Sequence, residues 1–359
     1  MHGRPLWADA AEAVDEDGQP GVLATTSKLL GSSTDRLPQG KLQCVRMRDA
    51  NHAATSQAVV QATRFHPGAS VMMTAGMDKT VRLFQVDGKE NALLQSVHVS
   101  DLPIISAHFT QGGNEIVMSG RRKFFYTYDL QEGKVRKIHE IQGRKERSLE
   151  NMFVSPDSKY IVFTGESGSL IMVSNKTKQW VNTLKMNGSA RAVTFMDDGQ
   201  KMLTSGSDGK VYVWDLRMNK CMHVFTDEGC IKSTALAASA GGEYVACGSD
   251  SGVVNVYDSS CLTKSSPTPI KAVMNLTTEI SHLEFHPKSQ ILGMSSRSKK
   301  ESFRMVHLPS CTVFSNWPTA GTPLGYVNSF GFSPGGGYTA VGNDKGKVLL
   351  YRVSHYPAM

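Results

Sequence analysis

Two short stretches contain residue types that could perform chemistry. Residues 165–169 (GESGS) place a serine between glycines, as in the nucleophile elbow of hydrolases, but Ser169 stands where that pattern needs its final glycine. Residues 342–347 (GNDKGK) resemble a phosphate-binding loop, but only three residues separate the two glycines, and Val348 stands where serine or threonine is needed. We therefore expect neither a nucleophile nor a nucleotide site, and we assign no catalytic residue.

Histidines and cysteines are the remaining candidates for catalysis or metal binding. His66 and His286 each follow a phenylalanine and precede a proline, and this repeated setting indicates a structural role. The cysteines show neither a C-x-x-C pair nor a histidine at zinc-finger spacing, so we expect small thiols in strands rather than a zinc site or disulfide frame. These cysteines are Cys44, Cys221, Cys230, Cys247, Cys261 and Cys311. No metal or cofactor is implied.

Basic side chains form the clearest candidate for a binding surface. Residues 121–147 contain nine bases and four acids, and a second basic group follows at 297–304. Such groups bind nucleic-acid backbones by displacing counterions, without sequence preference. The alternative is that they form solvated loops or pair with acidic protein neighbours. The candidate RNA or partner contacts are Arg121, Arg122, Lys123, Arg144, Lys145, Arg147, Arg297, Lys299 and Lys300.

Two irregular insertions, at 259–270 and 316–326, could carry further partner contacts. Long polar loops on a rigid scaffold often do so, and exposed tryptophan is enriched in binding hot spots. Trp317 in the second insertion is therefore added to the candidate contacts, with a tolerated surface insertion as the alternative.

An internal repeat predicts the scaffold that positions these residues. A landmark residue, usually phenylalanine, is followed by a turn, an apolar strand, a glycine, a tight turn and a second strand, as in FMDDGQKMLTSGSDGKVYVWDL at 195–216. The landmarks lie at 65, 109, 153, 195, 237, 285 and 332, spaced 42 to 48 residues apart. Short strands at this period indicate a β-propeller with four-stranded blades, in which each blade covers its neighbours' apolar faces. We therefore predict an all-β chain with seven blades.

Closure of the ring requires a strand from the N-terminal part. The last repeat ends at 351–359, which leaves too little chain for a fourth strand. The alternating segment 41–48 is the natural donor, so we predict a propeller over 41–359 in which 41–48 completes blade seven. Residues 1–40 are expected to form an acidic, flexible tail.

Composition narrows the class of protein further. The 359 residues are 40% hydrophobic and 20% charged, with a formal net charge of +7. Membrane helices need roughly 18 consecutive apolar residues, which the chain lacks, so no membrane contact is expected. Acidic residues such as Asp9 and Glu12 occupy the positions where a signal peptide would be apolar, so we expect an intracellular protein.

The repeats resemble those of the WD40 family, most clearly where VYVWDL at 211–216 supplies the terminal dipeptide. The Gly-His pair that opens such repeats is missing, so the hydrogen-bonded His, Ser, Asp and Trp tetrad of the family is expected to be incomplete in most blades. Strings such as PIKAVMNLTT at 269–278 and VHLPSCTVFSNWP at 306–318 further resemble a WD40 subunit of the UTP-B assembly of the small-subunit processome. The resemblance covers about residues 55–356.

This resemblance implies a non-catalytic scaffold in the nucleolus, within the nucleus, that acts in pre-ribosomal RNA processing and 18S ribosomal RNA maturation. Implied partners are other UTP-B subunits and processome proteins, with the backbone of pre-ribosomal RNA or of U3 small nucleolar RNA as a further candidate contact. No small-molecule substrate is implied. Family members can carry a charged N-terminal extension thought to engage RNA-decay factors. The first 50 residues match poorly, so a disordered or partner-ordered tail is the preferred interpretation.

Two other functions are compatible with the sequence. Residues 214–217 (WDLR) fit the WDxR pattern of substrate receptors for cullin-type ubiquitin ligases, although arginine is common at this position in ordinary repeats. An enzyme with its active site in a central channel is the second alternative, and it would place histidine, aspartate or glutamate side chains together in that channel.

Overall fold

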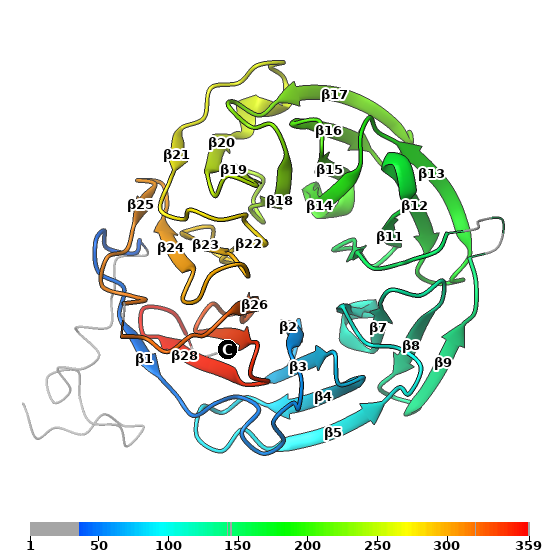
Figure 1. Ribbon diagram of the computed structural model, residues 1–359, viewed down its shortest axis with the longest axis vertical. Helices are drawn as coiled ribbons and strands as arrows, with labels where there is room; N and C mark the ends of the chain where they lie inside the picture. Colours follow the sequence, from blue (N-terminus) through cyan, green and yellow to red (C-terminus); the bar gives the residue numbers. More distant parts are fainter. Residues whose placement is uncertain (1–35, 142, 144–145, 320, 358–359) are drawn as a thin grey trace, which may run out of the picture. The chain divides into compact units, whose positions relative to one another are not determined.

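Seven small antiparallel sheets make up the folded part of the chain. The computed structural model describes residues 36–141, 143, 146–319 and 321–357. The chain divides into two units, Met1–Pro38 and Gln39–Met359, and the fold concerns the second. Within its described residues, 28 strands form seven four-stranded sheets, and the helical segments are short 3-10 turns. The sheets stand as blades in a ring (Figure 1), which confirms the predicted all-β, seven-bladed propeller.

Blades 1 to 6 are each a meander of four strands in chain order, and in all seven blades the innermost strand lines the central channel. Blade 1 contains β2 (Val60–Phe65), β3 (Val71–Gly76), β4 (Thr80–Gln85) and β5 (Leu93–His98). Blade 2 contains β6 (Ser106–Thr110), β7 (Glu115–Ser119), β8 (Phe125–Asp129) and β9 (Lys134–Ile138). Blade 3 contains β10 (Met152–Val154), β11 (Tyr160–Thr164), β12 (Ser169–Ser174) and β13 (Trp180–Lys185). Blade 4 contains β14 (Ala190–Met196), β15 (Lys201–Gly206), β16 (Lys210–Asp215) and β17 (Lys220–Thr226).

The later blades have shorter outer strands and longer connections. Blade 5 contains β18 (Ser233–Ala238), β19 (Tyr244–Ser249), β20 (Val254–Asp258) and β21 (Lys271–Val273). Blade 6 contains β22 (His282–Phe285), β23 (Ile291–Ser295), β24 (Phe303–His307) and β25 (Thr312–Val313). Blade 7 contains β26 (Val327–Phe332), β27 (Tyr338–Asn343), β28 (Val348–Val353) and, from the start of the chain, β1 (Cys44–Arg46).

The two-residue period of the strands explains why the blades stack. In β16, Val211 and Val213 belong to the apolar cluster between blades 4 and 5. The alternate residues Tyr212 and Trp214 belong to the cluster between blades 3 and 4. Each strand therefore supplies apolar side chains to the contacts with both neighbouring blades. Burying one such large side chain stabilises the fold by about 1.5–3 kcal/mol.

His66 and His286 have equivalent structural positions, one between blades 1 and 2 and the other between blades 6 and 7. The His66 ring packs edge-on against Phe109 of the next blade, and the His286 ring packs in the same way against Phe332. Nε2 of His286 lies 3.1 Å from the carbonyl oxygen of Gly336. A side chain on Gly336 would collide with the imidazole, so the glycine is needed for this close approach. The sequence prediction of a structural role agrees with this packing.

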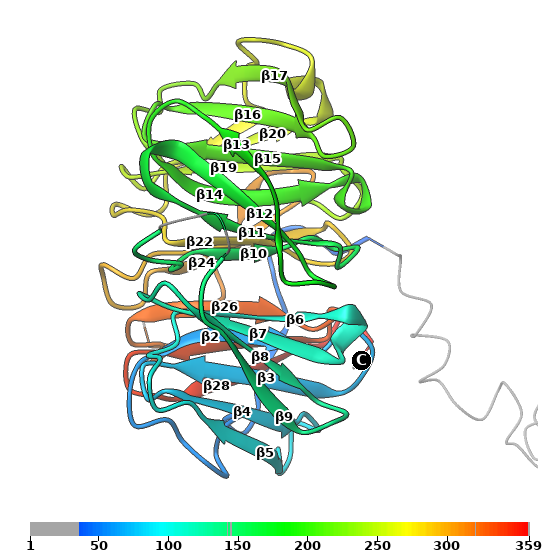
Figure 2. The same cartoon turned by 90° about the vertical axis from the view of Figure 1, so that its right-hand side faces the viewer.

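The N-terminal strand completes blade 7, as predicted. β1 pairs antiparallel with β28, with Val45 opposite Arg352, and Figure 1 shows the blue strand beside the red one. The regular strand is shorter than the predicted 41–48, because it covers Cys44–Arg46. Beyond it, the backbone N–H of Met47 still donates to the carbonyl oxygen of Leu350 at 2.9 Å. The side view in Figure 2 places β2 next to β26, and these two strands pack together in the closed ring.

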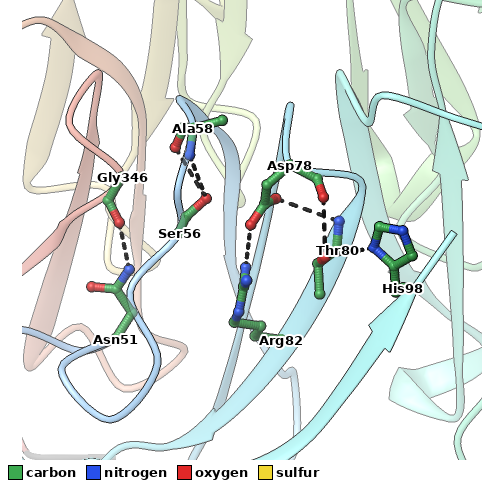
Figure 3. Close-up of polar contacts among 8 residues, drawn as sticks. All are labelled: Asn51, Ser56, Ala58, Asp78, Thr80, Arg82, His98 and Gly346. Carbon is green, nitrogen blue, oxygen red and sulfur yellow. Dashed lines mark hydrogen bonds and ion pairs between the residues drawn. The ribbon is translucent and has the colours of Figure 1, made fainter. Parts of the chain in front are cut away.

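Two asparagine side chains hold this N-terminal segment in place by forming the backbone hydrogen bonds that a neighbouring strand would otherwise form. The Asn51 amide donates to the carbonyl oxygen of Gly346 at 2.7 Å (Figure 3) and accepts from the N–H of Val348 at 2.9 Å. The Asn316 amide donates to the carbonyl oxygen of Leu42 at 2.8 Å and accepts from the same residue's N–H at 3.0 Å. Each amide therefore satisfies one backbone donor and one backbone acceptor.

The family tetrad is replaced by simpler pairs. In blade 1 the turn carboxylate of Asp78 binds the Arg82 guanidinium at 2.5 Å (Figure 3). In blade 4 the equivalent Asp208 accepts a hydrogen bond from the Tyr212 hydroxyl at 2.7 Å. Blade 4 also keeps a bond from the Trp214 indole to the Thr204 hydroxyl at 2.9 Å. In these two blades the turn aspartate is kept, but the side chain that it binds differs.

The six cysteines are free thiols, and Cys247, Cys261 and Cys311 are buried. In the described ranges, His, Cys, Asp and Glu side chains do not gather into a group that could hold a metal ion. Nor does any helix described there have the length and apolar character needed to cross a membrane.

Candidate partner and nucleic-acid interface

The predicted basic contacts lie mainly at one end of the propeller. We call this end the upper face and define it by the turns between the second and third strands of each blade and by the connections between blades. Residues 121–123 form such a turn between β7 and β8, and residues 297–300 form the equivalent turn between β23 and β24. Because all blades have the same strand order, these turns emerge on the same side of the ring.

In blade 2 the structure brings together two basic segments that are separate in the sequence. The backbone N–H of Leu149 donates to the carbonyl oxygen of Arg122 at 3.0 Å, so the connection containing Arg147 lies against the 121–123 turn. Arg122 and Arg147 are both exposed. The predicted contacts Arg144 and Lys145 lie outside the described residues.

Acidic neighbours neutralise part of this group. Arg121 Nη2 lies 3.1 Å from Glu150 Oε1, and Lys123 Nζ lies 3.8 Å from Glu140 Oε2. The hydrogen bond to Glu150 raises the pKa of Arg121, so its charge is maintained. Both bases are well exposed, and solvent screening makes surface pairs of this kind weak. A phosphate group could therefore compete for these bases at little cost.

The basic group of blade 6 is more open. Arg297, Lys299 and Lys300 are exposed, and Arg297 lies at the wall of the central channel. Lys300 Nζ lies 5.6 Å from the centre of the Tyr326 ring, which orients the ammonium group without neutralising it. This group therefore presents cations beside the channel mouth.

Trp317 corrects the sequence interpretation of the insertion at 316–326. Its side chain is only 7% exposed, so the expected exposed contact is wrong. The indole packs edge-on against Phe303 of blade 6 and Tyr351 of blade 7, with ring centres 5.8 and 4.8 Å away. The insertion folds back to fill the joint between the two blades, because a large apolar ring is more stable there than in water.

The channel contains a charged cluster that the sequence interpretation missed. Arg64 Nη1 lies 2.8 Å from Glu284 Oε2, and His282 Nε2 lies 3.1 Å from the same oxygen. The N–H of Phe332 donates to Glu284 Oε1 at 3.3 Å. Burial acts to raise the pKa of Glu284, but Arg64 and His282 outweigh it, so the pKa is lowered and the carboxylate stays charged. Burial, with Arg64 and His282 nearby, holds the pKa of His108 well below its usual value.

A repeated signal in the sequence marks these channel residues. Arg64, His108 and Glu284 each immediately precede a landmark phenylalanine, at 65, 109 and 285. That position lies in the channel-facing first strand of the blade. The channel is about 720 Å³ in volume. Its histidines and glutamate do lie together, as the enzyme alternative requires, but Arg64, His282 and Glu284 satisfy one another in a link between blades.

Comparison with known proteins finds a family of β-propeller repeats, in agreement with the seven-bladed fold. The WD40 family (WD domain, G-beta repeat) matches residues 43–85, 178–215 and 219–258. The chain is 44% identical over 353 residues to a U3 small nucleolar RNA-associated protein 18 homolog of Arabidopsis thaliana, covering 97% of this chain and 65% of the relative. It is 41% identical over 365 residues to the Homo sapiens homolog, covering 99% of this chain and 66% of the relative. The chain thus spans about two thirds of the length of these relatives.

A more distant relative extends the comparison. The chain is 31% identical over 369 residues to the probable U3 small nucleolar RNA-associated protein 18 of Schizosaccharomyces pombe, covering 98% of this chain and 71% of the relative. These names give no support to the ubiquitin-ligase alternative. Arg217, on which that alternative depends, is an exposed residue whose N–H donates to Asp215 at 2.7 Å. The chain belongs to the family of U3 small nucleolar RNA-associated protein 18 and its homologues.

Proposed function

We propose that this chain is a non-catalytic scaffold subunit of the small-subunit processome, acting in pre-ribosomal RNA processing and 18S ribosomal RNA maturation in the nucleolus. The main support for this proposal is the match, over 97–99% of the chain, to proteins named for their association with U3 small nucleolar RNA. The closed ring supports this role, because it holds several rim surfaces in fixed relation. The proposed partners are other UTP-B subunits and processome proteins.

RNA contact is proposed for the basic groups of the upper face. Arg121, Arg122 and Lys123 protrude from one blade, and Arg297 to Lys300 protrude from another on the same face. Exposed cations on a rigid ring can follow a phosphate backbone without reading its bases. The backbone would be that of pre-ribosomal RNA or U3 small nucleolar RNA.

Crosslinking on purified precursor particles tests both the scaffold role and the RNA contact. Protein crosslinks are read by mass spectrometry and RNA crosslinks by sequencing. The wild-type chain should sediment with particles that contain U3 small nucleolar RNA and crosslink to processome proteins. Absence from these particles would contradict the scaffold role.

Charge reversal separates the RNA proposal from the scaffold proposal. Arg121→Glu, Arg122→Glu and Lys123→Glu combined should reduce RNA crosslinks at blade 2 and flatten their dependence on salt. The matched control reverses three exposed bases of the opposite face and outer wall, Lys176, Arg217 and Lys220. If the first variant still associates with the particles and its RNA crosslinks are unchanged, the proposed RNA contact is contradicted. The scaffold proposal is unaffected by that result.

A further inference from the structure

We infer that the loop 227–232 presents Ile231 as the anchor for a protein partner whose surface has an apolar pocket rimmed by lysine or arginine. The loop joins β17 of blade 4 to β18 of blade 5 on the upper face. Ile231 is 85% exposed, more than any other large apolar side chain in the described part of the chain. Other connections between blades bury apolar side chains, although Met274 at the start of the connection from blade 5 to blade 6 is 70% exposed. Examples of the buried side chains are Leu102, Ile141, Leu149, Ile280 and Leu324.

Hydrogen bonds from blade 5 hold the loop in place. The carboxylate of Asp227, which is 1% exposed, accepts bonds from the Tyr257 hydroxyl at 2.7 Å and from the Asn255 amide at 2.8 Å. The Tyr257 hydroxyl also accepts from the N–H of Glu228 at 2.9 Å, and the Asn255 amide donates to the Glu228 carbonyl oxygen at 2.8 Å. The loop is therefore ordered before any partner arrives.

The loop is also seated between the turns of blades 4 and 5. A side chain on Gly209 would collide with the carbonyl oxygen of Cys230, so the loop lies directly on the blade 4 turn. On the other side, the N–H of Asp250 donates to the carbonyl oxygen of Lys232 at 3.1 Å. Ile231 is thus a fixed projection, and fixing a side chain in advance lowers the entropy lost on binding.

The charge around Ile231 identifies the kind of partner. Glu228 and Asp250 are exposed, and no cation in the described residues lies within ion-pair distance of either carboxylate. Asp227 lies beneath them, and Lys232 is the half-buried base of the same loop. The loop and the blade 5 turn that contains Asp250 therefore carry a net negative charge, although the whole chain has a net charge of +7. A phosphate backbone would be repelled, whereas a basic protein surface is complementary.

A site-specific test uses the full chain in cells. A photo-crosslinking amino acid replaces Ile231 in one variant and Met222 in the matched control. Met222 is 61% exposed on the outer strand β17 of blade 4, away from the loop. We expect a protein adduct at 231 that maps to one peptide containing apolar residues and lysine or arginine, at least tenfold stronger than at 222.

Two further variants make the test specific. Glu228→Lys combined with Asp250→Lys should reduce the adduct at 231 at least fivefold, because the complementary charge is reversed. Tyr257→Phe, which removes two of the bonds that order the loop, should also reduce it. Should Tyr257→Phe fail to fold, the two surface reversals still decide the point. RNA adducts at 231, equal adducts at 231 and 222, or an adduct insensitive to charge reversal would overturn the inference.

The inference rests on the proposed scaffold role only in requiring a protein partner. Particle association of the same variants is measured by sedimentation. Loss of the wild-type chain from the particles would contradict the proposed function, while the adduct at 231 decides the role of the loop in either case.

Discussion

Arg64 of blade 1 and Glu284 of blade 6 form an ion pair with a 2.8 Å Nη1–Oε2 distance, although blade 7 lies between their blades in the ring. Gly331 of blade 7 lies beside this pair and packs closely against the backbone of Thr63. A Cβ atom there would lie 3.0 Å from the carbonyl oxygen of Thr63 and 3.8 Å from Glu284 Oε1. The pair therefore links the first blade to the penultimate blade across the joint where the ring closes.

Replacing Arg64 should destabilise the propeller. Arg64→Met leaves a partly buried carboxylate with one cation fewer, and we expect the free energy of unfolding to fall by about 1–3 kcal/mol in urea titrations at pH 7. Arg121→Met removes a pair whose arginine side chain is 74% exposed, so it serves as the control and should have little effect. Equal losses in both variants would contradict a special role for the channel pair.

The same pair predicts an acid-dependent loss of stability. Because the pKa of Glu284 is lowered in the fold, its contribution is present above the unfolded value of about 4.3 and is lost as the pH falls through the folded value. Glu284→Gln should flatten the stability curve below about pH 4.5. A curve with the wild-type slope in this variant would exclude Glu284 as the cause.

His286 should make stability depend on pH in a higher window. Burial lowers its pKa to about 4, against an unfolded value of about 6.5. Between these values the unfolded chain binds more protons, so stability falls as the pH is lowered, by roughly 3 kcal/mol from this residue. His286→Gln should remove this part of the slope in urea titrations between pH 7.5 and 4. His108, whose pKa is also lowered, should account for a remaining slope.

Asn51 should control closure of the ring. Asn51→Ala leaves the carbonyl oxygen of Gly346 and the N–H of Val348 without their partner, and we expect a loss of about 2–3 kcal/mol. Deletion of residues 1–50 removes β1 but leaves Asn51 in the chain, and it should lower the melting temperature and the cooperativity much further in calorimetry. An unchanged unfolding transition after this deletion would contradict the role of the N-terminal strand.

Trp317 distinguishes a core residue from a partner contact. Trp317→Ala should cost about 3–5 kcal/mol of folding stability, because the ring packs between Phe303 and Tyr351. Trp180→Ala is the control, since that side chain is 45% exposed, and it should cost about 1 kcal/mol or less. A stable Trp317→Ala variant with weakened partner binding would restore the original hypothesis.

The sequence by itself determined the fold. A landmark every 42 to 48 residues and a two-residue alternation, as in Val211 to Trp214, specify short strands whose two faces both need cover, and a ring of seven blades satisfies that need. It also indicated the strand near 41–48 that completes blade 7, because the last repeat is one strand short.

Tertiary structure alone decided which side chains are exposed and which meet. Trp317 and Ile231 both lie in connections between blades, and local pattern does not distinguish the buried indole from the exposed isoleucine. Arg64 and Glu284 are 220 residues apart and adjoin only because the ring closes. Burial and long-range pairing depend on packing between blades, which no local spacing of residues records.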